Sequence, residues 1–128
     1  MVSMNFSGRF ADLVASKTKR QSIRADKTAR YRTGRALQLY TGMRTKACRK
    51  LTMVDPVIIE SVYCAVRPDY LTLGGPGYPK IDMDEFAALD GFANYAELVQ
   101  WFQDTYKQPT FIGHCIRWRF PDAVREAA

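Results

Sequence analysis

Two periodicities of apolar positions divide the chain into strands and helices. In its first half the pattern predicts a strand at 4–6, a helix at 9–16, and extended segments at 21–24, 36–40, 47–54 and 57–66. Ser7 stands where the N-cap of the first helix is expected. Pro56 lacks a backbone N–H, so it must lie at an edge or a break between the last two of these strands.

Helical spacing dominates the later part of the chain. Asp82 or Asp84 can open a helix that runs through Leu89, and Asn94 can cap a second helix that ends near Tyr106. The apolar stripe of that second helix, which includes Trp101, is expected in the core. An alternating stretch at 110–120 then predicts a final strand.

Glycine and proline cluster in residues 68–81, which contain the run Gly74-Gly75-Pro76-Gly77. We interpret this segment as a hairpin insertion with the Gly/Pro run at its tip. The Gly-Lys-Ser/Thr ending of a phosphate-binding P-loop is missing, so a structural role is the default interpretation.

This order of elements predicts a single α+β domain over residues 1–128, with a core at about 4–120 and a tail at 121–128. We expect about five to six mostly antiparallel strands with two to three flanking helices. Antiparallel strands that follow one another so closely in sequence can close into a small β-barrel.

Composition narrows the function classes. Residues 1–50 carry 13 Lys and Arg against two acids, whereas residues 51–128 carry six against 11. A basic half attracts polyanions, although a solvated surface is the competing interpretation.

Cys48, Cys64 and Cys115 form neither a paired framework nor a metal motif, which indicates reduced thiols, a cytoplasmic protein and no metal or other cofactor. No apolar run approaches membrane-spanning length; a monomer is the default, with the oligomeric state open.

The basic residues concentrate at 17–35, where we predict strand and loop. Cations can contact phosphate while an aromatic ring stacks on a base, which makes single-stranded RNA the expected partner. The candidate binding residues are Arg24, Lys27, Arg30, Tyr31, Arg32, Arg35, Tyr40 and Arg44. The alternative for the two tyrosines is packing at the barrel rim.

Side-chain alternation in an extended 21–24 segment separates two faces. Ile23 is expected toward the core with Gln21, while Ser22 and Arg24 share the other face, which Lys19 can also reach. The planar guanidinium of Arg24 suits a phosphate or a base carbonyl. His114, the single histidine, is expected to be a core or rim residue and not a metal ligand.

Four segments in order, "LVASKTKRQSIR", "RTGRALQLYTGMR", "LDGFANYAELVQWFQDTY" and "FIGHCIRWRF", resemble the ASCH domain, a relative of the PUA domain. The most specific part is the Lys-x-x-Ser/Thr-Ile-Arg string formed by Lys19, Ser22, Ile23 and Arg24. The resemblance covers about residues 4–120 and implies a PUA-like barrel with a cleft for RNA or a modified nucleoside.

One branch of that family hydrolyses the acetyl amide of N(4)-acetylcytidine, and the resemblance implies Lys19, Ser22 and Asp90 as catalytic residues. The branch characteristically has Thr at the position of Ser22 and Glu at that of Asp90, so the Asp90 side chain is one methylene shorter than the family's carboxylate. A lysine with a lowered pKa can act as a base toward Ser22 or a water. A non-catalytic RNA-binding regulatory module and a metal-assisted ribonuclease stay open as alternatives.

Overall fold

The computed structural model describes residues 1–25 and 29–121. Their elements, in chain order, are β1 (Val2–Phe6), α1 (Gly8–Ala15), β2 (Gln21–Arg24), β3 (Leu37–Thr41), β4 (Arg49–Lys50), β5 (Val57–Val66), β6 (Leu71–Leu73), α2 (Met83–Leu89), α3 (Tyr95–Tyr106) and β7 (Phe111–Arg119). The expected α+β class and the mostly antiparallel pairing are confirmed. Seven strands form, one or two more than expected.

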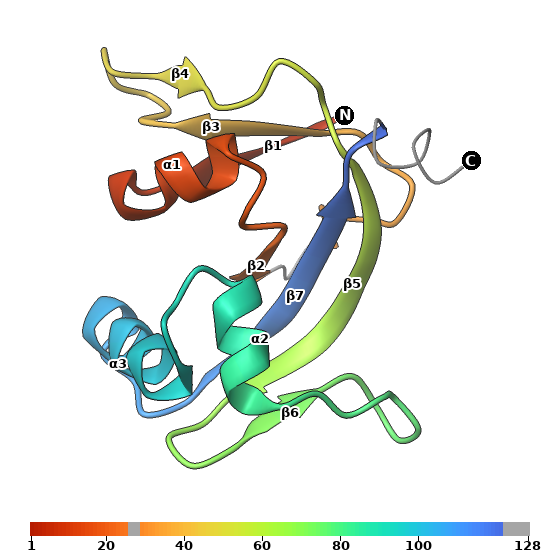
Figure 1. Cartoon of the computed structure of the whole chain (residues 1–128), viewed down its shortest axis with the longest axis vertical. Helices are drawn as coiled ribbons and strands as arrows, with labels where there is room; N and C mark the ends of the chain where they lie inside the picture. The colour runs from red at the N-terminus through yellow and green to blue at the C-terminus, as the bar shows by residue number, and fades with distance from the viewer. Residues whose placement is uncertain (26–28, 122–128) are drawn as a thin grey trace.

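The strands form two sheets (Figure 1). The smaller has the order β1-β3-β4, with β1 and β3 parallel, and the larger has the order β2-β7-β5-β6, with every pair antiparallel. An antiparallel bridge between Ala36 and Val57 links the two sheets. Among the described residues the ladders do not close into a barrel, although the long β5 and β7 strands curve strongly (Figure 1).

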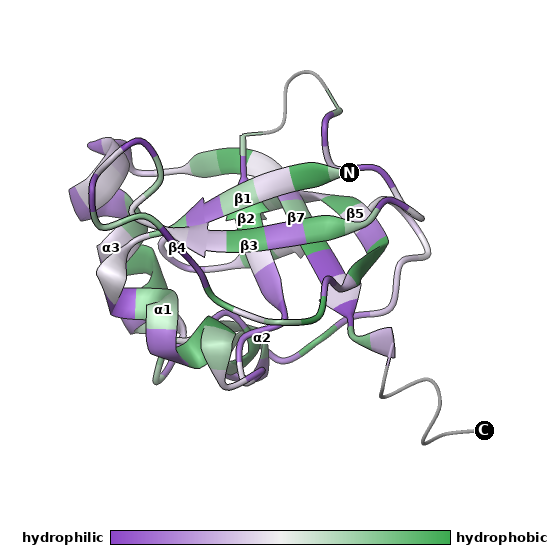
Figure 2. Ribbon diagram, turned by 90° about the horizontal axis from the view of Figure 1, so that it is seen from above, coloured by the Kyte–Doolittle hydropathy of each residue, from purple (hydrophilic) through white to green (hydrophobic). Residues whose placement is uncertain are grey.

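Burial follows the strand period on the smaller sheet. Val2, Met4 and Phe6 of β1 are buried while Ser3 and Asn5 are not, and Figure 2 shows the matching alternation of hydrophobic and hydrophilic residues along the strand. Strand β7 differs, because Cys115 and Ile116 are both buried. One face of β7 packs on the helices through Phe111 and Phe102, and the other packs on β1, where Trp118 meets Phe6. Burial on both faces removes the simple alternation.

The two late helices begin where the sequence predicted. Asp82 accepts a hydrogen bond from the backbone N–H of Glu85 at 3.1 Å, and Asn94 accepts one from that of Glu97 at 2.9 Å. Ser7 is the N-cap residue of α1, but its side chain makes no cap hydrogen bond. None of the helices in the described ranges has the length and apolar character needed to cross a membrane.

The predicted strand at 47–54 is wrong except at Arg49 and Lys50, which pair with β3. Residues 45–50 are exposed, and the N–H of Cys48 donates to the carbonyl of Thr45 in a turn. The hydroxyl of Thr52 donates to the carbonyl of Val54. Local turn hydrogen bonds replace the ladder because this segment has no apolar face to bury before Leu51.

The predicted hairpin within 68–81 is not formed, because that range holds a single strand, β6, which pairs with β5 outside it. The turn that joins β5 to β6 lies at Arg67–Tyr70, where the N–H of Arg67 donates to the carbonyl of Tyr70 at 3.1 Å. Gly74 to Gly77 follow β6 and lead toward α2. Leu71 and Leu73 of β6 pack against the core, and β6 pairs with β5. The Gly/Pro run that follows this short strand made it hard to predict from the sequence.

Candidate functional site

The turn at the C-terminus of α1 positions Lys19 in the site. The N–H of Thr18 donates to the carbonyl of Leu13 and that of Lys17 to Val14, both at 3.0 Å, with Lys17 at a φ of 65°. This is the Schellman arrangement, in which a left-handed residue closes the last turn. The N–H of Lys19 also donates to Leu13, so the chain turns inward directly before β2.

Asp90 is placed by a second Schellman turn at the end of α2. The N–H of Phe92 donates to Ala87 at 2.9 Å and that of Gly91 to Ala88 at 3.1 Å. Gly91 has a φ of +96°, a conformation that favours glycine. The Asp-Gly pair therefore stops the helix and turns the Asp90 carboxylate into the protein, where it is 3% exposed.

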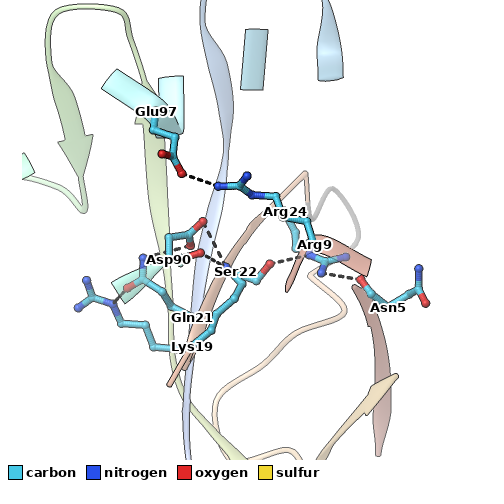
Figure 3. Close-up of polar contacts among 9 residues, drawn as sticks. Asn5, Arg9, Lys19, Gln21, Ser22, Arg24, Asp90 and Glu97 are labelled. Carbon is cyan, nitrogen blue, oxygen red and sulfur yellow. Dashed lines mark hydrogen bonds and ion pairs between the residues drawn. The ribbon is translucent and has the colours of Figure 1, made fainter. Parts of the chain in front are cut away.

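Lys19 and Asp90 form a buried ion pair (Figure 3). The Nζ of Lys19 lies 3.3 Å from Oδ2 of Asp90, and it also donates a hydrogen bond to the backbone carbonyl of Asp90. The same Nζ lies 4.8 Å from the centre of the Phe10 ring. The side chain of Asp90, although shorter than that of a glutamate, reaches Lys19. It does so because the backbone at Asp90 lies so close to Lys19 that its carbonyl also accepts a hydrogen bond from Nζ.

Burial shifts the pKa values of both members of this pair. Desolvation lowers the pKa of Lys19 and raises the pKa of Asp90, and the attraction between the two groups opposes each shift. The nearby Arg24 guanidinium lowers the pKa of Lys19 further. Burial therefore favours the neutral form of each group, and the neutral amine is the form of lysine that can accept a proton.

Gln21 extends the network across the sheet, and sequence reasoning missed its role. Its Nε2 donates to Oδ1 of Asp90 at 3.2 Å, and its Oε1 accepts from Nε of Arg117 at 3.2 Å. Arg117 pairs with Glu60, 3.4 Å away, whose other oxygen accepts from the Tyr78 hydroxyl at 2.7 Å. A glutamine on the inward face of a predicted strand was the available signal, because buried amides require partners.

Ser22 and Arg24 lie together on the other face of β2, as alternation predicted (Figure 3). Nε of Arg24 donates to Oγ of Ser22 at 2.9 Å, and Nη2 donates to the carbonyl of Asn5 at 2.7 Å. The guanidinium lies 5.0 Å from the centre of the Phe6 ring. Two hydrogen bonds and a ring contact hold the guanidinium in one orientation.

These side chains line one hollow of about 110 Å³. Its polar lining includes Lys19, Ser22, Arg24 and Asp90, together with Asn5 and Ser7. Its aromatic lining comes from Phe6, Phe10, Trp101, Phe102 and Tyr106. The expectation that Trp101 is simply core is incomplete, since it lines this hollow as well as packing on Phe10 and Phe102. The volume is well below that of a typical drug-sized pocket, so it suits a fragment such as an acyl group or part of a base.

The other predicted binding residues that the structure describes do not line the hollow. Lys27 is outside the described residues. The ring of Tyr31 is 9% exposed and belongs to the core, so it is not available for stacking on a base in this structure. Tyr40 is partly buried on β3, and Arg44 is exposed with a φ of 67°. Arg35 is partly buried, and its Nη1 donates to the carbonyl of Arg30 at 3.3 Å; Arg30 and Arg32 are exposed.

The described residues contain no group of three or more His, Cys, Asp or Glu side chains that could hold a metal ion. All three cysteines are free thiols, Cys48 exposed and the other two buried. His114 is partly buried on β7, apart from the ion pair.

Comparisons with protein-family models, with curated proteins and with solved structures found no match to this chain.

Proposed function

We propose that this chain is a PUA-like ASCH domain that binds RNA or a modified nucleoside and hydrolyses the acetyl amide of N(4)-acetylcytidine. The single observation that carries the proposal is the convergence of Lys19, Ser22, Arg24 and Asp90 on one small aromatic-walled hollow. Four groups from two chain segments, residues 19–24 and the end of α2, meet there, which is the pattern of a site that recognises a planar polar ligand.

The reaction assigns a task to each group. Lys19 first passes a proton to Asp90 within the ion pair. A water or the Ser22 hydroxyl then attacks the acetyl carbon, and the neutral Lys19 amine takes the proton released in this step. The carbon–nitrogen bond to N4 of the base then breaks, and N4 receives that proton as it leaves. Water attack gives acetate and cytidine directly, whereas serine attack passes through an acetyl ester that a second water cleaves.

Asp90 acts by orienting the lysine amine and by holding the proton that the amine gives up, whereas Arg24 acts by binding. The ion pair and the backbone hydrogen bond fix Nζ of Lys19 toward the hollow. The Arg24 fork, already anchored on Ser22 and Asn5, suits the carbonyl oxygen of the base or a phosphate. The aromatic lining offers surfaces against which a pyrimidine can pack.

A non-catalytic RNA-binding module is the second candidate, favoured by the exposed Arg30, Arg32 and Arg44 on the basic half of the chain. The buried ion pair then serves the fold alone. For the metal-assisted ribonuclease, no observation on the described residues favours that activity. The free thiols support the expected cytoplasmic setting of either candidate.

The deciding experiment incubates the protein with N(4)-acetylcytidine and follows acetate release. We expect turnover in the parent chain and its loss, by a factor of about 100 to 10,000, in Lys19→Ala. Lys80→Ala is the matched control, because Lys80 is exposed and does not line the hollow. Absence of turnover together with salt-sensitive RNA binding would assign the chain to the non-catalytic module.

A further inference from the structure

Three side chains form a row across one face of the larger sheet, and this row begins at the candidate site and ends at an exposed part of that face. Arg24 of β2 lies directly opposite His114 of β7, and His114 lies directly opposite Tyr63 of β5. Directly paired residues project from the same face of a sheet. The row therefore leads from Arg24, which lines the hollow, to Tyr63, which is 42% exposed.

The neighbouring apolar residue on this face is also exposed. Ile112 pairs with Ala65, is diagonal to Tyr63, and is 58% exposed. The opposite face at this position is covered, because Phe111 packs on Phe102 of α3, and Figure 1 shows α3 and α2 on the same side of β5 and β7. We call Tyr63, Ile112 and His114 the open-face patch.

A second hollow, of about 280 Å³, adjoins the patch at His114. Ser61 lies in its wall, and Arg32 brings an exposed cation to its edge. Nδ1 of His114 is shielded from solvent and has no hydrogen-bond partner in the described part of the chain. His114 also lines the hollow together with Ser61, so these two side chains offer polar groups to a base edge there.

We propose that the open-face patch binds single-stranded RNA next to the nucleotide whose base enters the Lys19 hollow. One base stacks on Tyr63, a base edge hydrogen-bonds His114 and Ser61, and Arg32 contacts phosphate. The segment at residues 29–33 borders the patch and carries the exposed Arg30 and Arg32. This positive charge favours a polyanion over an apolar protein surface as the ligand. The inference rests on the proposed function, and it makes the ligand an RNA strand and not a free nucleoside.

Fluorescence anisotropy with a labelled, mixed-sequence single-stranded RNA of about 16 nucleotides tests this inference. We expect Tyr63→Ala to weaken binding roughly tenfold and Tyr63→Phe to bind like the parent, because the ring is kept. Arg32→Ala should lower the slope of log affinity against log salt by about 0.7. Tyr70→Ala and Lys80→Ala are the matched controls, since both side chains are exposed on the β6–α2 side.

The readout is binding, so a chain that binds RNA but releases no acetate fails as an amidohydrolase while the patch stands. Equal RNA affinity in the parent and in Tyr63→Ala overturns the patch, as does undetectable RNA binding by the parent. Equal affinity for double-stranded RNA also overturns it, because paired bases cannot stack on the ring. Self-association that disappears in Tyr63→Ala would assign the patch to a second copy and overturn the proposal.

Discussion

The side-chain amide of Gln21 hydrogen-bonds Asp90 on one side and Arg117 on the other, at 3.2 Å in each case. Gln21 is 2% exposed, and Asp90 is 3% exposed. A single amide thus satisfies an acid from the end of α2 and a cation from β7. Because the amide has a donor and an acceptor, it can join two groups of opposite charge without carrying a charge itself.

Replacing Gln21 with leucine removes both hydrogen bonds while keeping most of the side-chain volume. We expect the free energy of unfolding to fall by about 1–3 kcal/mol, because an Asp90 oxygen and the Arg117 Nε lose their partner. Urea denaturation measures this difference. Gln108→Leu is the control, since Gln108 is exposed, and a change within about 0.5 kcal/mol is expected there. An equal effect in the two variants would contradict the bridging role.

Replacing Lys19 with methionine leaves the Asp90 carboxylate buried without its cation. Breaking a buried ion pair in this way costs about 3–5 kcal/mol near neutral pH. We expect urea denaturation to show a loss of this size in Lys19→Met. The double variant Lys19→Met/Asp90→Asn should recover much of it, because no unpaired charge stays buried and Asn can still accept from Gln21. A double variant no more stable than the single one would show that the loss does not come from the charge.

The free energy of unfolding of Lys19→Met should depend on pH in a defined direction. Burial raises the pKa of Asp90 above its ordinary value of 3.8, and loss of Lys19 removes an influence that lowers it. The folded variant therefore holds a proton that the unfolded chain has already released, and its stability falls as the pH rises through that interval. We expect the deficit of Lys19→Met against the parent to shrink between about pH 7 and about pH 4. The double variant should lack this dependence.

Strand period predicted one part of the site, and the family resemblance supplied Asp90 as the partner of Lys19. Alternation at 21–24 correctly grouped Ser22 with Arg24. The Asp90-Gly91 pair is visible in the sequence, and it forms the Schellman turn that brings Asp90 to Lys19. The role of Gln21 could not be derived, because its partners Asp90 and Arg117 are 69 and 96 residues away along the chain. Such contacts depend on the strand order β2-β7-β5, which no local pattern encodes.

The errors in the fold prediction have one physical origin. Residues 47–54 have strand-like composition but lie where a tight turn satisfies the backbone first, and only Arg49 and Lys50 pair. Leu71–Leu73 has few residues and lies beside a Gly/Pro run, yet it forms β6 because β5 offers a free edge with apolar neighbours. Tertiary partners decide short strands, and a single sequence does not reveal those partners.

The three cysteines should react in two classes. Cys48 is exposed, whereas Cys64 and Cys115 have no exposed surface. Burial also raises the pKa of the Cys115 thiol to about 12, which suppresses the reactive thiolate. We expect a thiol reagent such as Ellman's to label one cysteine in the folded protein and three in denaturant. Cys48→Ser should abolish the fast phase; a fast phase that persists would contradict the burial of the other two.

Gly113 allows β2 to lie close to β7, because a β-carbon there would come within 2.4 Å of the carbonyl oxygen of Arg24. The Phe111 ring, at 3.0 Å, blocks the other direction. Gly113→Ala must therefore push the Arg24 backbone away, and we expect a loss of about 1–3 kcal/mol in the free energy of unfolding together with weaker RNA binding. Gly8→Ala is the matched control, since a β-carbon at Gly8 meets nothing within 4 Å and alanine suits the start of α1. Urea denaturation and RNA anisotropy on both variants give the comparison, and a Gly113→Ala protein as stable as Gly8→Ala would show that β2 does not lie where this contact places it.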